Sequence, residues 1–262
     1  MEPERPAGDD GTSILMEEMT FERYLERIRG GAVVILPCGA IEQHGPHLPM
    51  KADAFIATAI AERTARAHDA LVAPSFNYGC KSQALSGGGQ VFGGTTSLDS
   101  DTFTRVLRDV LRELMRHGAT RMLVLNGHGE NQFPTYEGVD LALRDAGRDD
   151  VKILVAGWWQ FVSEERIREI YPGEFPGWDL EHAATTETSL MLALDPASVR
   201  HAHVLDERMD HVPPYAVFPQ PPDLVPRSGV MSRATPASRE LGEALLDTVR
   251  RGLDDLFRRE FP

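Results

Sequence analysis

Apolar residues recur at every third or fourth position in several stretches of the chain, which is typical of helices that pack on a core through one face. The clearest stretch runs from Ser100 to His117, and Gly118 follows it as a helix terminator. Thr20 is placed to N-cap another such stretch. In all, the pattern predicts helices over residues 21–29, 53–68, 100–117, 136–145, 183–194 and 238–261.

Short runs of aliphatic and β-branched residues separate these helices. An unbroken apolar run, rather than an alternating one, is typical of a strand that is buried on both faces of a sheet. Such runs predict strands at residues 32–36, 71–74, 122–125 and 151–155, whereas the Gly- and Ser-rich residues 77–96 and the Pro-rich residues 213–236 are predicted to be irregular. The alternation favours a single three-layer α/β/α domain with a mainly parallel sheet.

Composition and the amino-terminal residues narrow the functional classes. Residues 1–13 are acidic and rich in Pro and Gly, so we expect a disordered tail before a domain that spans residues 14–262. The 27 Lys and Arg residues against 40 Asp and Glu residues argue against nucleic-acid binding. No apolar run reaches the ~18 residues of a membrane span. Only two cysteines, Cys38 and Cys80, and no secretory signal are present, so we expect a cytoplasmic protein.

Five potential metal ligands follow two of the predicted strands. Glu42, His44 and Asp53 come after the first strand, and His128 and Glu130 come after the strand at residues 122–125. Ligands gather outside the carboxyl ends of the strands in open α/β sheets. Residues two apart in an extended segment project the same way, and Asp53 at a helix start is left free to bridge. Five ligands are too many for one zinc ion, which takes three or four, and fit two ions that share a carboxylate.

The mixture of imidazole and carboxylate suits zinc or manganese, and the lack of thiolate ligands argues against a purely structural zinc site. Two divalent ions beside three carboxylates leave a net charge of about +1, which lowers the pKa of a bound water from about 15.7 towards about 7. The ligand set therefore predicts a hydrolase. Either cluster alone would more often be a surface or capping loop than a metal site, and only the two together favour metal binding. His47, beyond Pro46, is expected to orient the loop rather than to bind metal.

Several motifs in order resemble the creatininase (creatinine amidohydrolase) family, from about Met16 to Pro262. The segment Leu36–Pro49 with Asp53 is similar to the first metal motif of the family, and Asn126–Asn131 is similar to the second. The other matching segments are Tyr78–Gln83, Ser86–Gly89, Gly94–Asp99, Gly177–His182, Glu187–Leu194, Pro214–Phe218 and Ser238–Gly242.

The resemblance implies two triads of metal ligands with Asp53 as the bridge. Glu42, Asp53 and His128 would hold one ion, manganese or zinc, and His44, Asp53 and Glu130 would hold a second, zinc. Glu130 would also take part in catalysis. Glu187, on the helix predicted at residues 183–194, is expected to hydrogen-bond a metal loop or merely to cap one, without binding metal.

The resemblance also implies a substrate site for a small amide. Ser86 would contact the substrate, Trp159 and Trp178 would flank it, and His182 would transfer a proton to the leaving nitrogen. Indole rings suit a flat, amidine-like ring. From the residues alone, Trp159 could instead belong to the core, and His182 at a helix start could be a solvated residue.

The chain departs from the family pattern at two positions near the expected substrate. Gly129 and Cys80 stand where the pattern has aromatic residues, so both shrink side chains and leave the metal chemistry intact. The resemblance implies hydrolysis of creatinine to creatine by a homo-oligomer, a hexamer in the family. The alternatives are the same chemistry on another small amide, such as a formamide, a lactam or a short modified peptide, or a metal-binding module without turnover.

Overall fold

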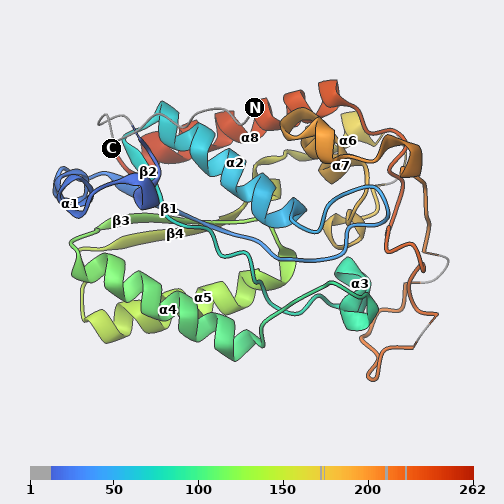
Figure 1. Cartoon of the computed structure of the whole chain (residues 1–262), viewed down its shortest axis with the longest axis horizontal. Coiled ribbons are helices and arrows are strands. Elements are labelled where there is room, and N and C mark those ends of the chain that lie inside the picture. Colours follow the sequence, from blue (N-terminus) through green and yellow to red (C-terminus); the bar gives the residue numbers. More distant parts are fainter. Residues whose placement is uncertain (1–12, 172, 174, 210–211, 222) are drawn as a thin grey trace, which may run out of the picture.

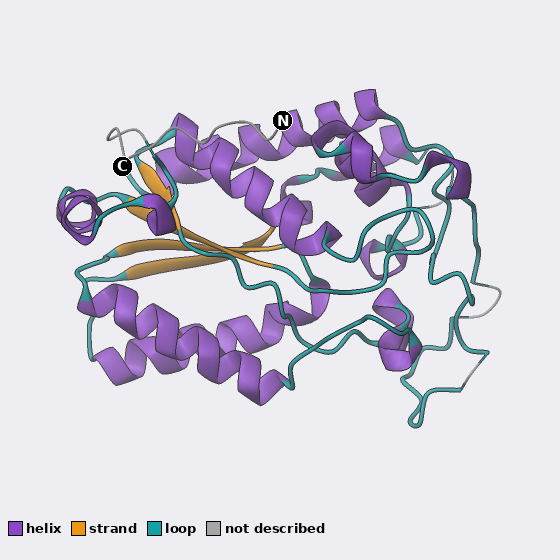
Figure 2. Ribbon diagram, in the orientation of Figure 1, coloured by secondary structure: helices purple, strands orange, loops and turns teal. Residues whose placement is uncertain are grey.

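Four parallel strands form the central sheet of the computed structural model, in the order β2-β1-β3-β4 (Figure 2). The strands are β1 (Val33–Cys38), β2 (Ala70–Val72), β3 (Arg121–Asn126) and β4 (Lys152–Gly157). The structure describes residues 13–262 except 172, 174, 210–211 and 222. The predicted tail, residues 1–13, therefore lies outside the described residues except for Ser13. The predicted parallel α/β sheet is confirmed.

The strand order places a switch point between β1 and β3. The chain leaves β1 for β2 on one side, whereas it leaves β3 for β4 on the other, and β1 and β3 pair directly with Cys38 opposite Asn126. Ligand sites in open α/β sheets form at such a point, outside the carboxyl ends of the strands. Both predicted metal loops begin there.

Alternate residues along each strand face two separate apolar cores. Val33 and Ile35 of β1 pack in one core with α2 (Ala52–Ala67), α7 (Thr185–Leu194) and α8 (Arg239–Glu260). Val34 and Leu36 pack in the other with α4 (Ser100–Arg116), α5 (Gln132–Ala146) and α1 (Phe21–Arg29). The two helical layers lie on opposite sides of the sheet (Figure 1), which confirms the three-layer arrangement.

The predicted helices are present, with three differences. The stretch 77–96 contains a short helix, α3 (Ala84–Gly87), and a 3-10 turn at Gly89–Val91. Helix α5 begins at Gln132 rather than near residue 136, and α6 (Glu164–Ile170) was not predicted. Further 3-10 turns are Met16–Glu18, Gly129–Asn131, Trp158–Phe161, Trp178–Leu180, Pro196–Ser198 and His201–His203.

The described part of residues 213–236 contains no helix or strand, as the Pro-rich composition predicts. None of the helices in the described residues combines the length and the hydropathy needed to cross a bilayer.

Candidate metal centre and active site

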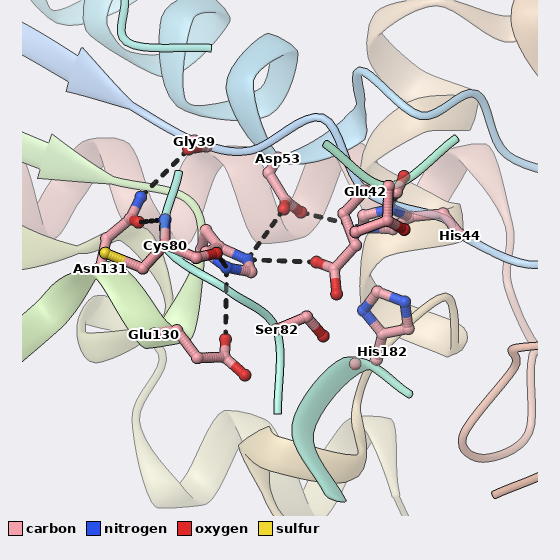
Figure 3. A network of polar contacts seen from close by, with 12 residues as sticks. Gly39, Glu42, His44, Asp53, Cys80, Ser82, Glu130, Asn131 and His182 are labelled. Carbon is pink, nitrogen blue, oxygen red and sulfur yellow. Dashed lines mark hydrogen bonds and ion pairs between the residues drawn. The ribbon is translucent and has the colours of Figure 1, made fainter. Parts of the chain in front are cut away.

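Three of the predicted ligands, Glu42, Asp53 and His128, meet at the carboxyl ends of β1 and β3. Figure 3 shows Glu42 and Asp53 close together there. His128 Nδ1 lies 3.1 Å from Glu42 Oε2 and 3.1 Å from Asp53 Oδ2. All three side chains are buried. This first triad has the membership that the resemblance implies.

A second triad uses the other side of the same aspartate. His44 Nε2 lies 2.9 Å from Asp53 Oδ1 and 3.5 Å from Glu187 Oε2, and ligand atoms of the three residues lie within 4.8 Å of one another. Glu187 enters from the first turn of α7. The structure thus brings Glu187, expected only as a neighbour of a metal loop, into the position where the resemblance implies Glu130.

Glu130 lies on the opposite side of His128 from Glu42. Its Oε2 is 3.4 Å from His128 Nε2, and its Oε1 accepts a hydrogen bond from the backbone N–H of Gln83 at 2.7 Å. His128 Nε2 also lies 3.1 Å from the carbonyl oxygen of Cys80. Glu130 therefore borders the first triad and the cavity, and not the His44 side of the site.

Hydrogen bonds between the two metal loops fix their separation. The Asn131 amide donates to the Gly39 carbonyl at 3.1 Å, and its Oδ1 accepts from the Cys80 N–H at 2.8 Å. A side chain at Gly127 would lie 2.4 Å from the backbone oxygen of Asp53, so glycine lets the second loop approach the start of α2. Asp53 is thereby held between both loops.

The donor atoms of the site fit a pair of cations. Glu42 Oε1, His44 Nε2 and Asp53 Oδ2 are buried and have no hydrogen-bond partner among the described residues. Buried polar atoms in proteins are normally satisfied by a hydrogen bond, a water or an ion. Five carboxylate or imidazole groups at this spacing are the donors that zinc and manganese take.

Burial and mutual charge shift the protonation of the ligands strongly. Burial raises the pKa of Glu42 to about 7, although the nearby His128 works against this. Burial would raise the pKa of Asp53 as well, but His44 and His128 outweigh it and hold that pKa below its usual range. Burial also disfavours the charged form of His44, yet Asp53 and Glu187 raise its pKa well above the usual value. The carboxylates thus create a strongly cation-attracting site.

A cavity of about 810 Å³ opens over the two triads. All four predicted substrate-contacting residues line it, namely Ser86, Gly129, Trp159 and Trp178, together with His182 and Glu130. Trp158, which the sequence did not single out, also lines the cavity and packs edge-on against both other indoles, with ring centroids 5.9 Å from Trp159 and 5.8 Å from Trp178. The aromatic wall therefore contains three indoles rather than two.

His182 lies beside the Glu42 carboxylate and the imidazole of His44 (Figure 3). Its ring centroid is 4.3 Å from that of His44, and its side chain is buried. Burial, with the neighbouring His44, lowers the pKa of His182 to about 3. A neutral imidazole at the wall of the cavity can accept and then return a proton.

The residue before His182 forms a further contact that the sequence did not reveal. Glu181 is buried, accepts a hydrogen bond from the Tyr171 hydroxyl, and accepts another from the Thr186 N–H at 2.8 Å. Burial and the charge of Glu187 raise the pKa of Glu181 to about 8. The segment that carries Trp178 and His182 is thus anchored at its carboxyl end.

Comparisons with known proteins find similar sequences along most of the chain. The family model described as Creatininase: Creatinine amidohydrolase matches residues 17–257. A creatinine amidohydrolase of Pseudomonas putida is 46% identical over 255 residues, which cover 95% of this chain and 98% of the relative. A mycofactocin precursor peptide peptidase of Mycobacterium tuberculosis is 38% identical over 177 residues, covering 64% of this chain and 60% of the relative.

Solved structures match over nearly the whole chain. A mutant creatininase complexed with creatine matches with a TM-score of 0.92 and 46% identity, covering 95% of this chain and 99% of that chain. A mutant creatininase of the Zn-Zn type matches with the same values. A manganese creatininase matches with a TM-score of 0.91, the same identity and the same coverage. With the family model covering most of its length and a relative 46% identical over 95% of it, this chain belongs to the creatininase (creatinine amidohydrolase) family.

Proposed function

We propose that this protein is a dinuclear metal-dependent amidohydrolase that opens a cyclic amide, converting creatinine to creatine. The observation that carries the proposal is the pair of ligand triads that share Asp53 beneath a cavity walled by indoles and His182. The creatinine amidohydrolase of Pseudomonas putida, 46% identical, and the matching creatine complex support the choice of substrate.

Glu42, Asp53 and His128 would hold one ion, and His44, Asp53 and Glu187 would hold the other. The matching zinc and manganese creatininases support these two metals. Two divalent ions at this place supply an activated water and polarise the substrate carbonyl. Glu130, beside His128 and facing the cavity, is a further carboxylate that can hold a water or a proton next to the reacting atoms.

The other residues bind the substrate and move the proton. Trp159 and Trp178 stack on the flat ring, and the Ser86 hydroxyl hydrogen-bonds it. Opening the ring breaks the bond between the carbonyl carbon and the ring nitrogen, adds a hydroxyl group to the carbon and a proton to the nitrogen. His182 transfers that proton.

The test incubates the zinc- or manganese-loaded protein with creatinine and measures creatine. We expect turnover by the wild type and a loss of at least about 10²-fold in His182→Asn, which retains the fold but not the acid–base group. Absence of creatine above the blank with a full complement of metal would rule out this substrate.

A second candidate substrate is an amide larger than creatinine, because the cavity has unfilled space beside Gly129. An added side chain at Gly129 would meet only the Ser86 hydroxyl, at 3.8 Å, within a cavity of about 810 Å³. The relatedness to a peptide peptidase supports this candidate. We expect Gly129→Tyr to retain creatinine hydrolysis and to lose activity on bulkier lactams or short peptides. If the wild type hydrolyses no bulkier amide in the panel faster than creatinine, this candidate is excluded.

We also infer that the protein is a cytoplasmic homo-oligomer, a hexamer by resemblance. Exposed aromatic side chains support self-association, since Phe133 and Phe218 are 78% and 79% exposed. Light scattering after size-exclusion chromatography measures the number of subunits, and a single 29.0 kDa species would contradict the inference.

A further inference from the structure

Gln43, between two metal ligands in the sequence, has every hydrogen-bonding atom of its side chain engaged. Its Oε1 accepts from the Gly45 N–H at 2.9 Å. Its Nε2 lies 3.0 Å from the Gly87 carbonyl oxygen and 2.9 Å from that of Gly229. An N–H donor at one end of the amide and two carbonyl acceptors at the other fix which end is oxygen and which is nitrogen.

The segments around Gln43 leave space for its side chain. Gly229 has a φ of +80°, and a side chain there would lie 1.8 Å from Gln43 Oε1. Gly87 lies at the end of α3, so the amide joins the first metal loop to two segments distant in the sequence. A buried amide with all its partners holds one conformation, because any other leaves polar atoms unpaired.

Two atoms of Gln43, its backbone oxygen and its side-chain nitrogen, contact the same nitrogen of His182. His182 Nε2 lies 2.7 Å from the backbone oxygen of Gln43 and 2.9 Å from its Nε2. A carbonyl oxygen only accepts hydrogen bonds, so a ring nitrogen this close must carry a hydrogen. Both hydrogens of the Gln43 amide already point to the carbonyls of Gly87 and Gly229, so the amide does not require an acceptor at His182.

We propose that Gln43 is a positioning residue that holds neutral His182 as its Nε2–H tautomer and leaves the lone pair on Nδ1. The inference rests on the proposed acid–base role of His182 and adds which nitrogen performs it. His182 lines the cavity, so its Nδ1 is the nitrogen available to a reacting group.

This tautomer sets the order of the proton movements. Unprotonated Nδ1 first accepts the proton that the attacking water loses as its oxygen bonds to the carbonyl carbon. The same nitrogen then donates that proton to the leaving ring nitrogen as the carbon–nitrogen bond breaks. The proton count closes, because His182 ends each cycle neutral, with Nε2–H still bonded to the Gln43 carbonyl oxygen.

The direct test is ¹⁵N NMR of the zinc-loaded, full-length protein labelled with ¹⁵N-histidine, in which zinc avoids paramagnetic broadening. The signals of His182 are those missing from His182→Asn. We expect a protonated-type shift for Nε2 and an unprotonated-type shift for Nδ1 in the wild type. An Nδ1–H tautomer would overturn the proposal. This readout requires neither creatinine turnover nor a Gln43 variant, so its failure is separate from a failure of the proposed function.

The role of the Gln43 side chain is tested with Gln43→Met, which keeps the length and removes the amide. The matched control is Gln220→Met, since Gln220 Nε2 donates to the adjacent Gly88 carbonyl at 3.0 Å and makes no contact with His182 among the described interactions. We expect Gln43→Met to retain zinc, to lower kcat on creatinine at least about tenfold with little change in KM, and to show both tautomers of His182. The control keeps the wild-type kcat and tautomer.

Wild-type kcat and an unchanged tautomer in folded, zinc-replete Gln43→Met would overturn the role of the side chain. Gln43→Asn provides a second variant if the methionine protein does not fold. Its amide is too short to reach both carbonyls, so we expect the same shift in tautomer with a smaller loss of kcat. A loss of kcat with a fixed Nε2–H tautomer would also contradict the proposal.

Discussion

At the scale of single residues, Asp53 is the side chain on which both triads depend. One of its oxygens faces His128 and the other faces His44, while its backbone lies in the first turn of α2. A neutral side chain of the same shape keeps the packing and removes the only negative charge shared by both ions. We therefore expect binding of either ion to depend on Asp53.

We expect Asp53→Asn to lose most of both ions and at least about 10³-fold in kcat, because each triad keeps only two of its three ligands. Metal analysis by inductively coupled plasma mass spectrometry and the creatine assay measure the two effects. Asp140→Asn, which changes an exposed aspartate paired with Arg144 on α5, is the control that retains both metal and activity. Two ions per chain in Asp53→Asn would refute the shared-bridge arrangement.

Glu187 and Glu130 can be distinguished by their separate positions. Glu187 lies 3.5 Å from His44, whereas Glu130 lies 3.4 Å from His128. We therefore expect Glu187→Gln to reduce the metal content to about one ion per chain. We expect Glu130→Gln to keep the ion on the His44 side and to lower kcat. Zinc titrations followed by metal analysis compare the variants, and two tightly held ions in Glu187→Gln would restore Glu130 to the second triad.

At the scale of elements, one carboxylate connects three segments around the cavity. Glu181 joins the end of α6 through Tyr171, follows the turn that carries Trp178, and caps the first turn of α7 through the Thr186 N–H. Trp178 also packs on Trp158 and Phe175. Movement of this turn would thus require breaking a buried hydrogen bond.

Tyr171→Phe removes the hydroxyl of this connection without changing the ring. We expect the KM for creatinine to rise about fivefold with kcat within about twofold, since the turn with Trp178 is held less firmly. Stability should fall by about 1 kcal/mol. The control Tyr24→Phe also loses a hydroxyl contact, to His117 at 3.1 Å and far from the cavity. It should lose stability and keep KM. Equal KM values in the two variants would show that the connection does not position the substrate.

The elements also show how far the sequence could predict the molecule. The strands and long helices follow from their apolar periodicity, because each buries a face in one of the two cores. The short α6 has only Ile167 and Ile170 as an apolar pair and no fully buried residue, which is too short a pattern to predict a helix, although Ser163 caps it through the Arg166 N–H. Helix α3 lies in a Gly-rich stretch whose composition favours a loop.

The site was predictable where ligands follow strands and not where distant segments meet. Glu42, His44 and His128 follow strand ends and Asp53 opens the next helix, so the order of elements predicts that they come together. Glu187 reaches the site only because α7 packs beside α2, a tertiary contact that sequence spacing does not contain. Gln43 lies within the segment Leu36–Pro49 that resembles the family, but its contacts with Gly87 and Gly229 can be identified only from the three-dimensional structure.

At the scale of the whole molecule, two bound ions would join β1, α2, β3 and α7 through their ligands. Repulsion among Glu42, Asp53 and Glu187 opposes the fold when no cation is present. Binding to the folded state alone stabilises it by about 2.7 kcal/mol at a free metal concentration 100 times Kd.

We therefore expect zinc to raise the melting temperature by several degrees and EDTA to lower it, as measured by differential scanning calorimetry. Asp53→Asn should show little zinc dependence, because it lacks the shared ligand. The exposed-site control Asp140→Asn should shift as the wild type does. A melting temperature that is independent of zinc in the wild type would mean that the ions do not link these elements.

The separation of the proposed ligands along the chain affects when each metal site can form during synthesis and folding. The two proposed triads run from residue 42 to residue 187, and one of the carbonyls that hold Gln43 belongs to residue 229. Closing so long a stretch of chain costs entropy and comes late in folding. A nascent chain that ends before α7 lacks Glu187, so we expect the second ion to bind only once α7 has docked beside α2. Hydrolytic competence would then follow completion of the fold, and unfinished chains would stay inactive.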